Sequence, residues 1–293
     1  MENAEILTMS QKNIHWFPGH MQKAIRLIKE RLKLVDIVLE LCDARAPKSS
    51  LNEVLRDITK HKKRIIILTK NDLADQDITN KWVKYLSTKD VSTLFGNLND
   101  NRFINQIKSE IAKVWSQNKA KTLPEGHKIL PPNVLVIGIP NVGKSTLINK
   151  LSGRKAASVA NRPGHTKNQQ YINVDGAFIL IDTPGILPPN YENKTYIHNL
   201  ALLGTIREEI LPIETLSIDL ATFLLDKYYH LLKSRFDIKE KINYPHELFK
   251  AIANRRGILG DELDVINRTQ SLLLTEFRNG LIGPISLETP NEE

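Results

Sequence analysis

Residues 138–146 leave few choices for the fold around them. They read Gly-Ile-Pro-Asn-Val-Gly-Lys-Ser-Thr, which fits the pattern G-x-x-x-x-G-K-[ST]. An apolar run at 133–137 precedes the pattern, and residues 147–151 follow it with helical spacing. A glycine loop between a strand and a helix turns backbone N–H groups toward phosphate oxygens. The sequence therefore predicts an α/β domain that binds a phosphorylated ligand.

The side chains of this loop have different expected roles. Lys144 neutralises the β- and γ-phosphates, and the Ser145 hydroxyl is offered to Mg²⁺. Gly138 and Gly143 let the backbone curl around the phosphates. The nucleotide contacts predicted in the loop are Asn141, Val142, Gly143, Lys144, Ser145 and Thr146.

Apolar periodicity along the chain alternates between strands and helices. Strands are predicted at 36–42, 64–69, 91–95, 133–137, 169–174 and 177–181, the last two paired around the Asp175-Gly176 turn. Helices are predicted from about Met21, at 51–59, at 77–86 with Asp77 as its cap, and at 103–114. Residues 117–132 read as a connection, and only helices follow Pro189, at 200–210, 218–232, 246–253 and 262–277. We therefore expect one α/β domain over residues 1–190, with an N-terminal arm at 1–20, and a helical domain over 191–293.

Length and composition agree with two ordinary domains. The chain has 293 residues, of which 41% are hydrophobic and 25% charged, as in globular proteins. Its single cysteine, Cys42, excludes an internal disulfide and a cysteine-rich zinc site. The sequence contains neither a signal-peptide pattern nor an apolar stretch that could span a membrane, so a cytoplasmic location without membrane association is expected.

The basic charge is unevenly distributed. Lys and Arg exceed Asp and Glu by eight over the whole chain. Residues 188–293 hold 12 Lys and Arg against 16 Asp and Glu, a balance of −4, which leaves +12 for residues 1–187. A polyanion such as RNA is therefore expected to contact mainly the first two thirds of the chain.

A second phosphate-related pattern follows the loop. The apolar run at 177–181 ends in Asp182-Thr183-Pro184-Gly185, where Asp182 can hold Mg²⁺ and the N–H of Gly185 can meet the γ-phosphate. Between the two patterns lies Thr166, whose hydroxyl is expected to complete the metal shell. The order and spacing are typical of the phosphate loop and switch segments of GTPases. The predicted Mg²⁺ ligands are Ser145, Thr166 and Asp182.

A candidate base-recognition motif lies upstream of the phosphate loop. The apolar run at 64–68 leads into Thr69-Lys70-Asn71-Asp72. A carboxylate at Asp72 can accept both N1–H and the N2 amino group of guanine, and Lys70 can lie over the base. No such motif follows Gly185. The base motif therefore precedes the phosphate loop, which is the reverse of the usual GTPase order.

With this order the chain resembles the circularly permuted GTPases. Trp16-Phe17-Pro18-Gly19-His20-Met21, Asp43-Ala44-Arg45-Ala46-Pro47, the loop with Pro140-Asn141-Val142 and the C-terminal helices are similar to the bacterial ribosome biogenesis GTPase A family, also called RbgA or YlqF, over residues 14–285. The resemblance implies a circularly permuted P-loop GTPase domain with a small all-α C-terminal domain. It also implies GTP hydrolysis during late maturation of the large ribosomal subunit, stimulated by the particle. The expected partners are GTP or GDP and the precursor subunit with its rRNA, and we expect a monomer.

The resemblance also implies how water is activated. Ile186 occupies the position of the water-orienting Gln of Ras-like enzymes, so the family assigns that role to His20, with Lys144 and Thr166 completing the catalytic group. His165, beside Thr166, is a rival for the same role. Asn141 is implied as a ligand of K⁺.

The sequence departs from the family pattern at two places, and two alternative functions remain open. Thr69 replaces the Asn that usually opens the base motif, and residues 94–97 show no Ser-Ala-Lys-like element to support the base. The alternatives are a tRNA-modification GTPase and a nucleotide-dependent RNA-binding module with little catalysis. The permuted order and the lack of a C-terminal thiol argue against the tRNA-modification reading.

Overall fold

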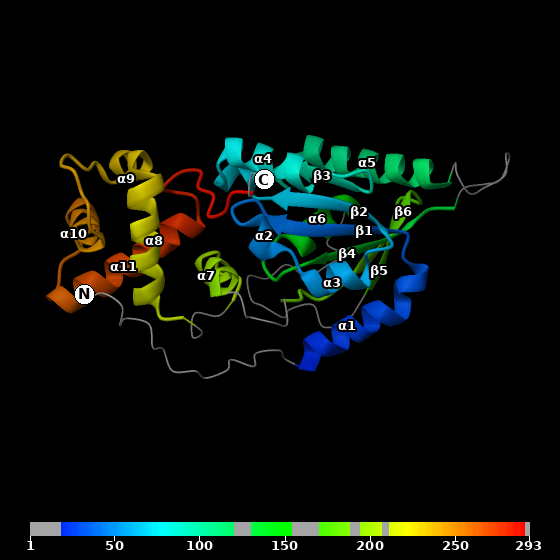
Figure 1. The fold of residues 1–293 in the computed structure, drawn as a ribbon, viewed down its shortest axis with the longest axis horizontal. Coiled ribbons are helices and arrows are strands. Elements are labelled where there is room, and N and C mark those ends of the chain that lie inside the picture. Colours follow the sequence, from blue (N-terminus) through cyan, green and yellow to red (C-terminus); the bar gives the residue numbers. More distant parts are fainter. Residues whose placement is uncertain (1–18, 120–129, 154–169, 188–193, 207–210, 291–293) are drawn as a thin grey trace, which may run out of the picture.

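The computed structural model describes residues 19–119, 130–153, 170–187, 194–206 and 211–290. Within these ranges a six-stranded sheet with flanking helices occupies one half of the molecule, and a group of helices occupies the other (Figure 1). None of the helices in this part of the chain is both long and apolar enough to cross a bilayer.

The six strands form one mostly parallel sheet in the order β3-β2-β1-β4-β6-β5. β5 alone among them runs antiparallel to its neighbour. Their bounds are β1 Ile37–Asp43, β2 Lys63–Thr69, β3 Val91–Phe95, β4 Asn133–Gly138, β5 Gln170–Val174 and β6 Phe178–Asp182. The parallel α/β fold and the β5–β6 hairpin are thus confirmed. β1 lies between the strand of the base motif and that of the phosphate loop, so the permuted chain order still brings both motifs to one edge of the sheet.

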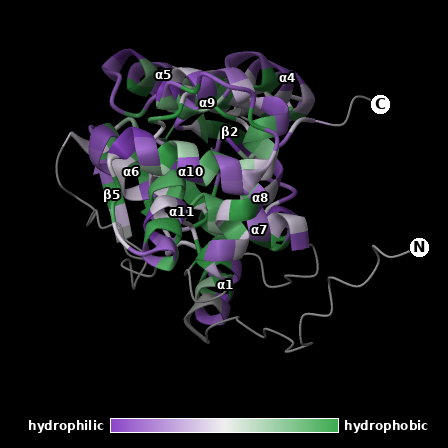
Figure 2. Cartoon of the chain, turned by 90° about the vertical axis from the view of Figure 1, so that its left-hand side faces the viewer, coloured by the Kyte–Doolittle hydropathy of each residue, from purple (hydrophilic) through white to green (hydrophobic). Residues whose placement is uncertain are grey.

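Helices flank the sheet and also form the helical half of the molecule. Their bounds are α1 Gly19–Arg31, α2 Pro47–Ser50, α3 Glu53–Ile58, α4 Gln76–Leu86, α5 Asn101–Lys119, α6 Lys144–Ser152, α7 Lys194–Leu202, α8 Ile213–Lys227, α9 Tyr229–Phe236, α10 Pro245–Arg256 and α11 Glu262–Arg278. Seen from the helical end, α8, α10 and α11 stand in front of the sheet, and α1 and α5 lie on opposite sides of it (Figure 2). Short 3₁₀ turns cover Leu32–Leu34 and Asn71–Leu73.

The alternation of β2 explains why helices pack on both faces. Ile66 and Leu68 belong to a cluster with Trp82 of α4, whereas Ile65 and Ile67 belong to the main core with residues of α5 and α6. All four isoleucine and leucine side chains are fully buried. A central parallel strand must be apolar on both faces, as this one is.

Two helix boundaries differ from the sequence prediction because of local capping. Asp75, not Asp77, caps α4, since the Asp75 carboxylate accepts the N–H groups of Asp77 (2.9 Å) and Ile78 (3.1 Å). The helix predicted at 200–210 is wrong in extent, because α7 starts at Lys194 and ends at Leu202. Gly204 has φ +68° and its N–H and that of Thr205 bond back to the last turn, which closes the helix.

The single helix predicted at 218–232 is also wrong. The chain forms two helices, α8 and α9, that meet at Tyr228, whose φ of −130° lies outside the helical region. The Tyr228 hydroxyl donates to the Ser286 carbonyl (3.2 Å) and accepts the Ser286 N–H (3.1 Å). A contact with a residue 58 positions away therefore sets this break.

After α11 the chain returns to the sheet. Leu287 N–H donates to the Arg45 carbonyl (2.7 Å), and Ile285 N–H donates to the Leu73 carbonyl (2.9 Å). The Glu288 carboxylate accepts the N–H groups of Lys48 (2.8 Å) and Ser49 (3.1 Å) at the start of α2. The end of the described chain thus ties the helical group to the loops at the carboxyl edge of the sheet. The domain boundary near residue 190 stays a prediction.

Candidate nucleotide-binding site

The phosphate loop joins β4 to α6, as the pattern predicted. Gly143 precedes α6 with φ +104°, and a Cβ on Gly138 would lie 2.7 Å from the carbonyl oxygen of Leu41, so both positions require glycine. The N-terminus of α6 adds partial positive charge at the loop. Backbone and helix together form a cradle suited to phosphate.

Lys144 is buried and turned into this loop. Its Nζ donates to the carbonyls of Gly138 (3.1 Å) and Ile139 (3.0 Å), and the residue is 8% exposed. Burial lowers the pKa of Lys144 to about 8, against the opposing influence of Asp182. Among the described residues, the hydrogen bonds of this buried cation go to carbonyl oxygens, and an anionic phosphate would stabilise its charge.

Asp182 ends β6 beside this lysine. Burial raises the pKa of Asp182 to about 6, against the opposing influence of the Lys144 charge. Neither of its carboxylate oxygens has a hydrogen-bond partner within the described residues, and the residue is 1% exposed. A buried carboxylate without a partner, near the half-buried Ser145 at the start of α6, fits the oxygen ligands that Mg²⁺ prefers.

The residues after Asp182 fold onto the phosphate loop. The Thr183 hydroxyl donates to the Val136 carbonyl (2.7 Å), and the Ile186 N–H donates to the Gly138 carbonyl (3.3 Å). A Cβ on Gly185 would lie 3.0 Å from the Lys144 Nζ. The Ile186 side chain is fully buried, so it has no access to an attacking water.

The base motif lies at the same edge, one strand beyond β1. The Thr69 hydroxyl donates to the Val142 carbonyl (2.8 Å), which links the motif directly to the phosphate loop. This threonine therefore supplies a loop contact where the usual Asn is missing. Lys70 has φ +56° and its Nζ donates to Asp43 (3.0 Å). Asp72 is exposed in the 3₁₀ turn that follows.

The loop after β3 also reaches the phosphate loop. Gly96 N–H donates to the Leu68 carbonyl (3.2 Å). A Cβ on Gly96 would collide with the ring of Phe103, so glycine is required at this position. A Cβ on Gly143 would lie 2.8 Å from Cδ1 of Leu98. Residues 96–98 thus border the site although their sequence carries no base-recognition signal.

The structure brings most of the predicted site residues to this edge. It unites Thr69, Lys70, Asp72, Asn141, Val142, Gly143, Lys144, Ser145, Thr146, Asp182 and Gly185. Thr166 and His165 lie outside the described residues. His20 lies in the first turn of α1, and its side chain is outside the description. Sequence reasoning missed the part played by Asp43, although an acidic residue at the end of the neighbouring parallel strand was a usable signal.

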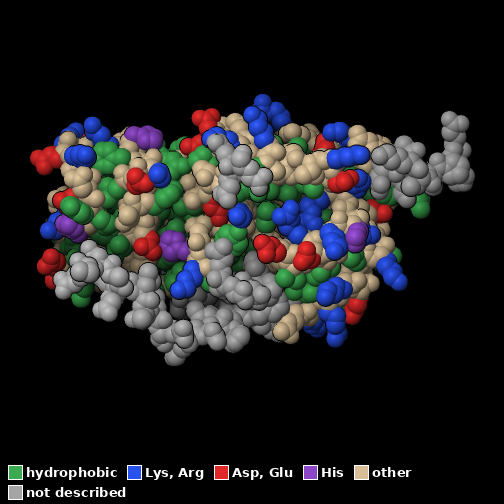
Figure 3. Space-filling view, in the orientation of Figure 1, with side chains coloured by type: hydrophobic (Ala, Val, Ile, Leu, Met, Phe, Trp, Pro, Cys, Tyr) green, Lys and Arg blue, Asp and Glu red, His purple; other side chains and the backbone are tan. Residues whose placement is uncertain are grey.

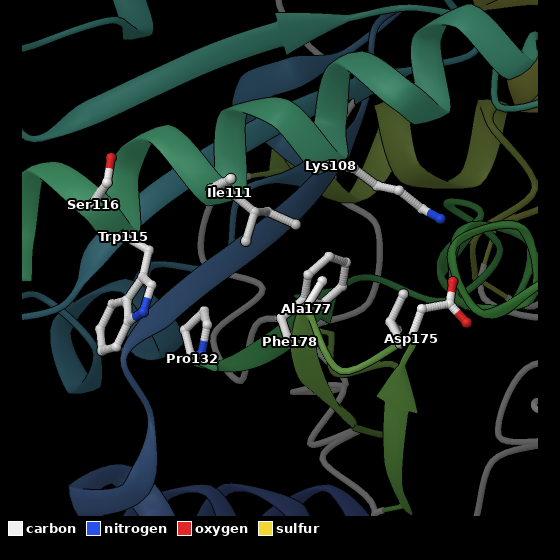
Figure 4. Close-up of a pocket in the computed structure, with 10 residues that line it drawn as sticks. Lys108, Ile111, Trp115, Ser116, Pro132, Asp175, Ala177 and Phe178 are labelled. Carbon is white, nitrogen blue, oxygen red and sulfur yellow. The ribbon is translucent and has the colours of Figure 1, made fainter. Parts of the chain in front are cut away.

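A separate cavity of about 280 Å³ lies at the other edge of the sheet (Figure 4). Ile111 and Trp115 of α5 line it together with Pro132 and Phe178. Pro132 precedes β4 and Phe178 begins β6, whereas the phosphate loop and Asp182 follow the ends of these strands. This cavity is therefore not part of the nucleotide site.

Known proteins show the same combination of loop and fold. Residues 133–255 match the family described as 50S ribosome-binding GTPase, a match that begins at β4. Ribosome biogenesis GTPase A of Bacillus cereus is 38% identical over 280 residues, covering 95% of both chains. The protein of that name from Thermotoga maritima is 34% identical over 279 residues, covering 94% of this chain and 95% of the other.

Solved structures agree. The GDP-bound structure of TM YlqF has a TM-score of 0.60 at 26% identity and covers 91% of this chain and 100% of that one. GNP-bound YlqF from T. maritima has a TM-score of 0.58 at 27% identity and covers 92% and 100%. Since relatives above 30% identity match over nearly their whole length, this chain belongs to the ribosome biogenesis GTPase A family.

Proposed function

We propose that this protein hydrolyses GTP as an assembly factor in late maturation of the large ribosomal subunit. The observation that carries the proposal is the buried pair of Lys144, whose ammonium lies in the phosphate loop, and Asp182, whose carboxylate oxygens have no hydrogen-bond partner among the described residues. Both lie at the edge where the base motif also ends. Family membership supports the ribosomal role over a tRNA-modification enzyme or a passive RNA-binding module.

The chemistry is phosphoryl transfer to water through positioning and electrostatics. Lys144 and the backbone N–H groups of 143–146 bind the phosphates, while Asp72 and Lys70 hold the guanine. Ser145 and Asp182, with Thr166 as a further proposed ligand, would hold Mg²⁺, which supplies positive charge at the β- and γ-phosphates. The buried Ile186 cannot orient the attacking water, so another residue has to do so.

A monovalent cation completes the proposed site. Asn141 has φ +58°, and its Nδ2 donates to the carbonyl of Gly204 (3.3 Å). The amide oxygen of Asn141 then stays available as a ligand, and oxygen donors suit K⁺. We assign Asn141 to K⁺ on this geometry and on the family resemblance.

The ribosomal contact is assigned mainly to the sheet-containing half of the chain. On the face in Figure 3, Lys and Arg gather over this half, while the helical half carries a more even mixture of charges. Phosphate contacts of this kind are independent of sequence and weaken with salt. Residues 1–190 are proposed as the GTPase domain and 191–293 as a helical domain that makes additional rRNA contacts, with one copy of the chain acting in the cytoplasm.

Ribosomal particles are expected to stimulate GTP hydrolysis by about tenfold or more, because one positioned water-orienting group contributes on this scale. The rate is also expected to be higher in K⁺ than in Na⁺. Steady-state phosphate release, measured with and without precursor large subunits in matched K⁺ and Na⁺ buffers, checks both expectations. A fast isolated enzyme that responds to neither additive contradicts the proposal.

Replacing His20 with Ala is expected to lower stimulated hydrolysis about tenfold to a thousandfold while GTP and subunit binding persist, because the group acts in the transition state. His61→Ala is the control, since His61 is an exposed histidine before β2. Both binding and turnover need to be measured. Collapse in His165→Ala with retained stimulation in His20→Ala would transfer the role to His165, and lost GTP affinity in His20→Ala would make His20 structural.

A further inference from the structure

Asp43 is a buried carboxylate at the nucleotide edge, and it opens the Asp43-Ala44-Arg45-Ala46-Pro47 motif, which has been given no role so far. It ends β1, between β2 and β4, and it is 2% exposed. The Arg45 side chain donates two hydrogen bonds to it, from Nε to Oδ1 (2.9 Å) and from Nη2 to Oδ2 (2.8 Å). Although burial alone raises the pKa of Asp43, Arg45 and Lys70 hold that pKa well below its usual range, so the group is an anion.

The second side chain that bonds to this carboxylate is the lysine of the base motif. Lys70 Nζ donates to Oδ2 of Asp43 at 3.0 Å, and the lysine side chain is 32% exposed. The backbone of Lys70 is left-handed, and Asp72 follows in the 3₁₀ turn. A lysine on a flexible stem has many rotamers, and an anchored Nζ restricts them before the ligand arrives.

Arg45 connects this carboxylate to the helical half. Its Nη1 donates to the carbonyl of Arg278 at the end of α11 (3.2 Å), and its guanidinium lies 5.5 Å from the centre of the Phe277 ring. The Arg45 carbonyl accepts the N–H of Leu287 from the returning segment. A continuous set of contacts therefore runs from α11 through Arg45 and Asp43 to Lys70.

We propose that Asp43 is a positioning residue for the guanine nucleotide. It holds the Lys70 side chain in its binding orientation, and Arg45 fixes Asp43 to the end of α11, so affinity for the nucleotide depends on the C-terminal helices. The inference rests on the proposed function, specifically on Lys70 and Asp72 as the residues that bind guanine.

A purely structural ion pair is the competing explanation, and the same strand offers a matched control. Glu40, three residues earlier in β1, is 1% exposed and pairs with Arg64 of β2. Arg64 also donates to the Thr59 hydroxyl (2.7 Å), and within the described residues neither Glu40 nor Arg64 is hydrogen-bonded to Lys70. Loss of either pair weakens the core, but only loss of the Asp43 pair releases Lys70.

The test is a double-mutant cycle on the full-length protein, with the dissociation constants of fluorescent GDP and GTP analogues and thermal unfolding as readouts. Asp43→Asn is expected to weaken nucleotide binding about tenfold, whereas Glu40→Gln lowers the melting temperature and leaves affinity within about twofold. In a Lys70→Met background, Asp43→Asn should change affinity less than about twofold. An equal loss in both backgrounds, or no loss in the wild-type background, overturns the proposal.

Arg45→Lys is a second test variant. It keeps the buried positive charge but removes the guanidinium group that makes two hydrogen bonds to Asp43. It is expected to weaken binding several-fold in the wild-type background and not in the Lys70→Met background, and an uncoupled effect overturns the link to α11. If Asp43→Asn does not fold, this cycle decides the proposal.

Asp72→Asn distinguishes failure of the base site from failure of the proposal for Asp43. Unchanged base preference in that variant refutes the base site itself. An altered preference without coupling between Asp43 and Lys70 refutes only the positioning role of Asp43.

Discussion

Replacing Lys144 with Met is expected to lower GTP hydrolysis by about a thousandfold or more, because the charge that stabilises the transferring phosphate is lost. The same substitution should stabilise the nucleotide-free protein. The buried ammonium has its pKa lowered from 10.5 to about 8, so its charge disfavours folding at neutral pH. Allowing for two lost hydrogen bonds, the expected gain in the free energy of unfolding is about 0.5 to 2.5 kcal/mol.

The pH dependence distinguishes this cause from improved packing. The unfolded lysine binds its proton more tightly than the folded one, so the penalty is fully present below pH 8 and disappears as the pH rises from about 8 toward 10.5. The stability advantage of Lys144→Met should shrink over that interval, as measured by denaturant unfolding without nucleotide. Lys150→Met, an exposed change in the same helix, is the control and should alter neither property. Preserved hydrolysis in Lys144→Met, or a less stable apo protein, would contradict the role given to Lys144.

Local patterns in the sequence were enough to predict the sheet. β3 spans the predicted residues, and β4, β6 and the phosphate loop follow from apolar runs bounded by glycine and aspartate. Where a helix ends in a local cap, as at Gly204 of the α7 loop, apolar spacing misled the prediction because it continues past the cap. Hydrophobic periodicity reports burial and does not report which backbone groups are already bonded.

Long-range contacts account for what the sequence could not show. Arg45 bonds to a carbonyl 233 positions away, and the Tyr228 break depends on Ser286. The Thr69 substitution looked like the loss of an amide, but its hydroxyl reaches the Val142 carbonyl across β1. Such contacts depend on strand order, which the sequence analysis did not predict.

Asp72→Asn is expected to reverse base preference. The Asp72 carboxylate is exposed at the nucleotide edge and forms no hydrogen bond or ion pair with another described side chain, so it can accept N1–H and the N2 amino group of guanine. Each hydrogen bond to a charged acceptor contributes about 1.5 to 3 kcal/mol, so GTP affinity should fall about a hundredfold. An amide presents an N–H donor in place of one acceptor oxygen, which suits the C2 carbonyl of xanthine. Binding of xanthosine triphosphate should therefore improve in the same variant.

Competition binding with GTP, xanthosine triphosphate and ATP measures this reversal. Asp75→Asn is the matched control, because it makes the same change of charge three residues later, where the side chain caps α4 instead of facing the nucleotide edge. Asn is also a good helix cap, so this control should keep both fold and base preference. If Asp72→Asn and Asp75→Asn discriminate alike between GTP and xanthosine triphosphate, guanine recognition does not lie in the 3₁₀ turn. It would then have to come from another part of the same edge, such as the loop at residues 96–98.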